Sequence, residues 1–270
     1  MRDPERALRW LTSVNYYRLS AYFLPFKEGE NFRPGSDFND IAGLYIFDRK
    51  LRLLMLDAIE RIEVAIRTAV TYEIAHTYGP FGHTEPANFS SDFKHERFMD
   101  DLNTEERRAR ETFTKHFREK YGEDPCLPVW MATELLSFGT VSKLYQSLQP
   151  KLRQRIARPY GVDAKFLISW LHVLTYIRNV CAHHKRLWNR HLAIRPKIPS
   201  KKVITPLTIP DTGRLYAVVV VVRYLMTVIS PHSLWQDRLT GLLAEHPDVS
   251  LAAMGFPCAD RFSIPVRPAC

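Results

Sequence analysis

Paired cysteines are missing from this sequence. Its cysteines lie far apart along 270 residues, and no two have the C-x-x-C spacing of zinc ribbons or redox motifs. They are Cys126, Cys181, Cys258 and Cys270. The pattern therefore indicates neither a disulfide framework nor a zinc site built from cysteine.

Long apolar runs are missing as well. The first ten residues, MRDPERALRW, contain no apolar stretch of the kind found in signal peptides. The most apolar run, from Leu215 to Ile229, is interrupted by Arg223 and is shorter than the roughly twenty residues that span a membrane. We therefore expect a buried core helix there, no membrane association and a cytoplasmic protein.

Acidic residues are scarce in one segment of the chain. Between Pro125 and Pro210 there are 14 Lys or Arg but only 2 acids, Glu134 and Asp163, so the segment carries +12. Because the whole chain carries +9, the remainder sums to −3. Positive charge confined to one part of a fold is typical of a protein that binds a polyanion, nucleic acid first. A solvated basic surface that only aids solubility is the alternative.

Helical periodicity dominates the sequence, and no stretch alternates with a period of two. Apolar residues recur every three or four positions from Leu44 to Ala69, which predicts one long helix or two nearly collinear ones. Residues 90–122 interleave acids and bases and predict a solvated helix packed by one narrow face. Further helices are expected at 129–138, 141–148, 164–184 with Asp163 as N-cap, 212–229, and after Pro231. We predict an all-α helical bundle that forms a single domain over residues 1–270.

A polar face is expected on the helix that starts at Ala164. His172, Tyr176, Asn179 and His183 follow one another at spacings of four, three and four, which places them on one side. A polar stripe on a strongly apolar helix costs stability unless its members are paired or face a cleft. The stripe ends in the segment RNVCAHHKRLWN, residues 178–189, and this segment is the candidate site.

The residue types in this segment suit phosphate chemistry. Histidine changes charge near neutral pH and can move a proton, while the permanent charge of Arg178 can hold a phosphate. A metal site is disfavoured, because no acid lies between Asp163 and Asp211 and the surrounding cations would repel a metal ion. The structural alternative is that Asn179 and His183 satisfy buried polar groups at a helix end, with Arg186 and Trp188 stacked on the surface. Spacing alone does not decide between these interpretations.

Four motifs, taken together, resemble a known family. They are VNYYRLSAYFLPF (Val14 to Phe26), YIFDRKLRLLMLDAIERIEVAIR (Tyr45 to Arg67), RNVCAHHKRLWNR (Arg178 to Arg190) and MGFP (Met254 to Pro257). In this order they resemble the Abi family of bacterial abortive-infection proteins, the AbiD/AbiF-like group of the HEPN superfamily. The resemblance implies a helix before the first motif, which here would be reduced to MRDPERALRWL.

The resemblance also implies an activity. HEPN ribonucleases carry an R-x(4 to 6)-H motif near the end of a core helix, and Arg178 to His183 fits it with four intervening residues. By resemblance Arg178 and His183 are catalytic, Asn179 supports them, and His184 is the next candidate. In such enzymes the motifs of two protomers, or of two domains, meet to form one RNA-cleaving site that needs no metal or other cofactor, and a homodimer is expected here. Some relatives are toxins restrained by a small RNA, so an antitoxin or regulatory RNA is an expected partner.

Further residues are expected to support this chemistry or to bind RNA. The basic continuation of the motif would contact RNA, together with a base among the N-terminal aromatics: Lys185, Arg186, Trp188, Arg190 and Arg18. Tyr176 and His172 would support the site, and Glu60 or Glu63, if buried against Arg178, would orient its guanidinium; otherwise Glu63 forms an ordinary i,i+4 pair with Arg67. Two rival functions use the same charge: an RNA-binding module without catalysis, and a structural dimer that binds an acidic protein.

Overall fold

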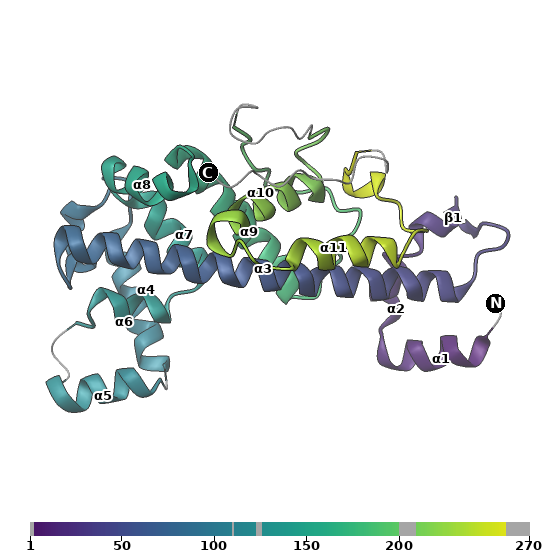
Figure 1. Cartoon of the computed structure of the whole chain (residues 1–270). Helices are drawn as coiled ribbons and strands as arrows, with labels where there is room; N and C mark the ends of the chain where they lie inside the picture. The colour runs from purple at the N-terminus through teal and green to yellow at the C-terminus, as the bar shows by residue number, and fades with distance from the viewer. Residues whose placement is uncertain (1–2, 110, 123–125, 200–208, 258–270) are drawn as a thin grey trace.

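One long helix organises the molecule. The computed structural model describes residues 3–109, 111–122, 126–199 and 209–257, and in it α3 (Phe38–Tyr78) is a single helix of 41 residues against which several of the other helices pack (Figure 1). A capping box starts α3, because the Asp37 carboxylate accepts a backbone N–H and Asp40 binds the N–H of Asp37 in return. The helix stops at Gly79, whose φ of 84° favours glycine. The prediction of one long helix is therefore confirmed.

Short helices fill the rest of the described chain, so the all-α prediction is confirmed. They are α1 (Pro4–Ser13), α2 (Tyr16–Ser20), α4 (His95–Arg108), α5 (Thr112–Tyr121), α6 (Val129–Ala132), α7 (Phe138–Ser147), α8 (Pro150–Ala157), α9 (Ala164–Ala182), α10 (Leu215–Ile229) and α11 (Trp235–Ala244). The sequence did not indicate the small antiparallel hairpin of β1 (Lys27–Glu28) and β2 (Asn31–Phe32). Strands of two residues are too short to show an alternating pattern.

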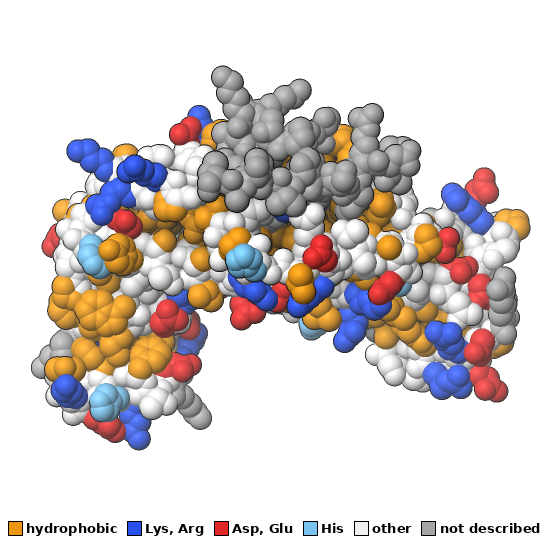
Figure 2. All heavy atoms as spheres, in the orientation of Figure 1, with side chains coloured by type: hydrophobic (Ala, Val, Ile, Leu, Met, Phe, Trp, Pro, Cys, Tyr) orange, Lys and Arg blue, Asp and Glu red, His pale blue; other side chains and the backbone are white. Residues whose placement is uncertain are grey.

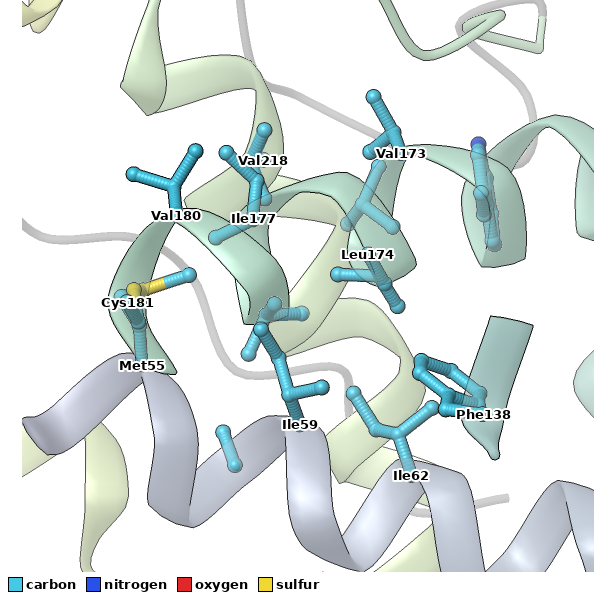
Figure 3. Packing of buried hydrophobic residues seen from close by; sticks show 14 of the residues in the cluster. Met55, Ile59, Ile62, Phe138, Val173, Leu174, Ile177, Val180, Cys181 and Val218 are labelled. Atoms are coloured by element: carbon cyan, nitrogen blue, oxygen red, sulfur yellow. The ribbon is translucent and has the colours of Figure 1, made fainter. Parts of the chain in front are cut away.

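Helix α9 packs across α3 and forms the centre of the core. Met55 and Ile59 of α3 face Leu174, Ile177 and Cys181 of α9 in a packed interface (Figure 3). Helices α6, α7, α8, α10 and α11 also contact α3. The buried face of α3 keeps spacings of three and four residues and continues past Ala69 as far as Ile74: Met55, Ile59, Ile62, Ile66, Val70 and Ile74.

Helix α10 is the predicted core helix. From Leu215 to Leu225 every residue except the half-buried Tyr224 is buried. Its first turn starts three residues later than expected, since the Asp211 carboxylate accepts the N–H of Gly213 at 2.7 Å and holds residues 211–213 in a turn. No helix in the described ranges is both long and apolar enough to cross a membrane.

Other predictions about the helices also differ from the structure. The helix expected at 129–138 is the shorter α6, and the one expected at 141–148 starts earlier, as α7. Residues 90–122 form α4 and α5 rather than one helix, and a salt bridge between Glu106 and Arg118 joins the two. Asp163 precedes α9 as predicted, but its side chain makes no capping hydrogen bond. The N–H of Ala164 instead binds the side-chain oxygen of Gln154 at 3.0 Å, so a residue from α8 replaces the local cap.

The molecule extends further below α3 at its two ends than in its middle (Figure 1). In the space-filling view the surface is hollowed below α3, between the end formed by α4, α5 and α6 and the end formed by α1 (Figure 2). Acidic and basic side chains are interspersed on this face.

A buried histidine makes the stability of the fold sensitive to acid. His83 is 1% exposed, neither ring nitrogen has a hydrogen-bond partner among the described residues, and burial, followed by the nearby His95, lowers its pKa from 6.5 to about 4. The unfolded chain therefore takes up the proton first, and stability falls as the pH drops from about 6.5 to about 4, by about 3 kcal/mol. Urea unfolding across this pH range should show a shallower acid slope for His83→Leu than for wild type. The matched change at the exposed His116, His116→Leu, should leave the slope unchanged, and equal slopes for wild type and His83→Leu would contradict the prediction.

Candidate functional site

The RNVCAHH segment forms the last turn of α9 and the loop that leaves it. The N–H of His184 binds the carbonyl of Cys181 at 3.0 Å, and the N–H of Lys185 binds the carbonyl of Val180 at 2.9 Å. These two bonds are those of a Schellman motif, which usually has glycine in its left-handed position. Here His184 occupies that position with a φ of 54°. A strained residue at a candidate site favours a role for its side chain.

The strain at His184 leads to a prediction. Glycine has no Cβ to clash in the left-handed region, so His184→Gly is expected to stabilise the protein by roughly 0.5–1 kcal/mol. His184→Ala keeps the Cβ and should show no such gain. Urea denaturation of both variants measures the difference. Equal or lower stability of the glycine variant would show that the histidine side chain offsets the backbone strain.

The helical period divides the motif into two faces. Val180 and Cys181 are buried in the core, Cys181 against α3, whereas Arg178, Asn179 and His183 are exposed. The three exposed side chains form no hydrogen bond or ion pair with any described residue, so they do not satisfy buried polar groups, as the structural alternative required. His172 is also exposed and Tyr176 half-buried, which places the whole stripe toward solvent. These five polar groups therefore remain available to a ligand.

The cysteine inside the motif is not a nucleophile. Cys181 is 1% exposed and packs against Met55 (Figure 3). Burial raises the pKa of its thiol to about 12, so the reactive thiolate is not formed at neutral pH.

A buried carboxylate fixes the loop after the motif. Asp48 of α3 is fully buried, and its two oxygens accept the backbone N–H groups of Leu187 and Trp188, the latter at 2.6 Å. The same carboxylate forms a salt bridge with Arg52 and accepts the hydroxyl of Tyr22 at 2.5 Å. Burial and the Asp48 charge raise the pKa of Tyr22, so its hydroxyl stays protonated and donates. One side chain thus ties together α3, the chain just after α2, and the loop of the motif.

Two arginines bring α2 against the same loop. Arg18 donates to the carbonyl of His184 at 2.6 Å, and Arg186 donates to the carbonyl of Ala21 at 2.7 Å. Between them lies an open cleft of about 650 Å³. Its walls come from the α2 region (Asn15, Tyr17, Arg18, Ala21, Tyr22, Leu24) and from the motif (His183, His184, Lys185, Arg186, Arg190), with no acidic residue among them. Arg178 and Asn179 lie one turn earlier on α9, outside this cleft.

The structure therefore brings part of the predicted set together. Arg18, His183, His184, Lys185 and Arg190 share one cleft, although Arg18 is 166 positions from His184 in the chain. Arg186 also lines the cleft, but its guanidinium donates to the carbonyl of Ala21 and thereby holds the two walls together. Lys201 and Lys202 of the basic segment, and Cys258 and Cys270, lie outside the described residues.

Three of the predicted roles are wrong. Trp188 is 3% exposed and belongs to the core, so it offers no surface to RNA. Glu63 does not orient Arg178, because its carboxylate binds Arg67 at 2.6 Å, and Arg67 also donates to the carbonyl of Thr133. Glu60 is exposed and has no ion pair in the described part of the chain, so it is not buried against Arg178 either.

Sequence reasoning missed Asp48 and Tyr22. An acid within a strongly apolar helical stripe was the available signal, because such a residue must find partners when it is buried. Asp48 and Arg52 are four residues apart, as are the exposed ion pairs on many helices, so the spacing alone did not indicate burial. Among the described residues, no three His, Cys, Asp or Glu side chains are placed to hold a metal ion.

A family model matches the chain. The model described as Abi-like protein covers residues 9–189. The chain belongs to the Abi-like protein family. The matched region includes Asp48 and every residue that lines the cleft except Arg190, and it ends at Asn189, before α10 and α11. The features that define the candidate site are thus contained in the Abi-like part of the chain. Comparisons with curated proteins and with solved structures found no match.

Proposed function

We propose that this Abi-like protein is a metal-independent endoribonuclease of the HEPN class, which acts as a homodimer in abortive infection or as a toxin in bacterial defence. The observation that carries the proposal is the exposed set Arg178, Asn179 and His183, which has no partner among the described residues and adjoins an acid-free basic cleft. Unpaired cations around a histidine suit a substrate with phosphate groups.

The reaction needs one proton acceptor, one proton donor and a phosphate clamp. In the proposed mechanism His183 removes the proton of a ribose 2'-hydroxyl, and that oxygen attacks the adjacent phosphorus. The bond from phosphorus to the 5'-oxygen breaks, and the departing oxygen takes a proton from the equivalent histidine of a second protomer. The products are a 2',3'-cyclic phosphate and a 5'-hydroxyl. Arg178 stabilises the charge that develops on the phosphate, and Asn179 and His184 assist.

We propose that the acid and the base come from two protomers. Besides His183, the exposed histidines on α9 and directly after it are His184, to which the proposal gives an assisting role, and His172. His172 lies three turns earlier on α9, too far along the helix to share one phosphodiester with His183. Two copies that meet through the exposed end of α9 would supply an acid and a base together.

RNA cleavage in EDTA tests the proposal. Wild-type protein should cut single-stranded RNA in the presence of EDTA and leave 2',3'-cyclic phosphate and 5'-hydroxyl ends, which end-labelling and mass spectrometry distinguish from other termini. Cleavage that requires an added divalent metal, or products with a 5'-phosphate, would show that a different chemistry operates.

The cleft favours a second candidate function, an RNA-binding module that holds a regulatory or antitoxin RNA without cutting it. Four cations line the cleft: Arg18, Lys185, Arg186 and Arg190. If each contacts a phosphate, log Kd should rise with log salt concentration with a slope of about 3, since single strands give about 0.7 per contact. Salt-dependent binding with no cleavage under any condition would favour this function over the nuclease.

A further inference from the structure

Tyr17 is the most exposed of the large hydrophobic side chains on the described surface. It is 83% exposed on α2 and lines the same cleft as His183 and Lys185. Its ring meets Tyr16 edge to face at 5.7 Å, and Tyr16 in turn meets Phe23 at 5.7 Å. Tyr17 is thus braced from one side by a short chain of aromatic rings, while most of its surface stays open.

The backbone under Tyr17 is firmly held, although α2 has only five residues. The side chain of Asn15 accepts the N–H of Tyr17 at 2.8 Å and caps the helix. The next residue, Arg18, is bound to the carbonyl of His184, and Ala21 is bound by Arg186. The position of this ring is therefore set by the loop that carries the candidate catalytic histidine.

The two walls of the cleft have complementary chemistry. The wall formed by the motif is cationic, with Lys185 and Arg190, and the opposite wall presents the ring of Tyr17 and Leu24, which is 61% exposed. A ligand that fits both walls carries a negative charge and a flat apolar group. A nucleotide has both, because its phosphate suits the cations and every base has a face that stacks on an aromatic ring.

We infer that Tyr17 forms a nucleobase subsite, in which one unpaired base of the RNA stacks on its ring while the neighbouring phosphate binds the cationic wall. The inference rests on the proposed function for the identity of the ligand as RNA. It assigns the substrate class more narrowly, because a base within a duplex is stacked on its neighbours and cannot reach the ring. The preferred substrate is therefore single-stranded at this position.

Binding to two polyanions tests the subsite. Fluorescence anisotropy of full-length His183→Ala protein, in which cleavage is suppressed, gives the affinity for a single-stranded oligoribonucleotide. A second oligomer of equal length, with tetrahydrofuran spacers in place of nucleosides, carries the phosphates but no bases. Tyr17→Ala should weaken binding of the RNA by about 5- to 100-fold and leave binding of the spacer oligomer unchanged. Tyr17→Phe keeps the ring and should bind RNA like the parent.

Tyr72→Ala is the matched control, since Tyr72 is 55% exposed on α3, away from the cleft. It should not change either affinity, and circular dichroism should confirm that all variants are folded. If Tyr17→Ala weakens both oligomers equally, or neither, the base subsite is wrong. If Tyr17→Ala weakens RNA binding as expected but the wild-type protein never cleaves RNA, the nuclease proposal is wrong and the base subsite stands. If the wild-type protein cleaves RNA efficiently but Tyr17→Ala binds RNA as tightly as its parent, the base subsite is wrong and the nuclease proposal stands.

Discussion

His183→Ala is expected to reduce the rate of RNA cleavage by about 10²- to 10⁴-fold, which is the usual contribution of a general acid or base. The exposed ring of His183 has no partner among the described residues, so its removal leaves no unsatisfied buried group. The midpoint of urea unfolding should therefore stay close to that of wild type. Single-turnover cleavage of a labelled RNA in EDTA, together with urea unfolding, measures both quantities.

A nearby histidine provides the control for this experiment. His191 is exposed and lies in the same basic segment, eight residues beyond His183. His191→Ala removes the same imidazole from the same electrostatic region, so a general loss of basic character would affect both variants alike. We expect activity close to wild type for His191→Ala. Activity of His183→Ala within a factor of about three of wild type would sink the catalytic assignment.

Asp48→Ala is expected to destabilise the fold by about 3–5 kcal/mol, because removal of one partner from a buried ion pair leaves the other charge uncompensated. Arg52 is 4% exposed and loses its carboxylate, and the N–H groups of Leu187 and Trp188 lose their acceptor. Urea denaturation measures the change. The same carboxylate fixes the loop beside the cleft. Without urea, where Asp48→Ala is still folded, its affinity for RNA should therefore be lower than that of wild type.

The exposed i,i+4 pair Arg97–Asp101 gives a matched control for Asp48. Its spacing along the helix is that of Asp48 and Arg52, but both of its side chains are more than 60% exposed, and the N–O distance is 4.0 Å. Asp101→Ala should leave the unfolding midpoint unchanged within error, since solvent screens such pairs. Asp48→Asn keeps an acceptor for the backbone N–H groups and should fall between wild type and alanine. Equal effects at positions 48 and 101 would show that burial does not govern the contribution of the pair.

Residues of similar appearance in the sequence proved to have different environments. Asp48–Arg52 and Glu63–Arg67 have the same spacing on α3, yet the first pair is the buried centre of a network and the second lies near the carbonyl of Thr133. Trp188 closely follows Lys185 and Arg186 and resembles a surface aromatic, but its backbone N–H donates to the buried Asp48 and its ring lies in the core. The periodicity of a helix does not reveal which residues of other helices or loops will pack against its charged or aromatic side chains.

The sequence by itself determined the helices and the two faces of the motif. A period of 3.6 residues must separate Arg178, Asn179 and His183 from Val180 and Cys181, so one set is exposed when the other is buried. Only the tertiary structure decided that Arg18 meets His184, that Tyr17 lies across the cleft from Lys185, and that Asp48 holds the loop between them. These contacts join residues separated by more than 130 positions, and they form because α9 packs across α3 and brings the end of α9 beside α2.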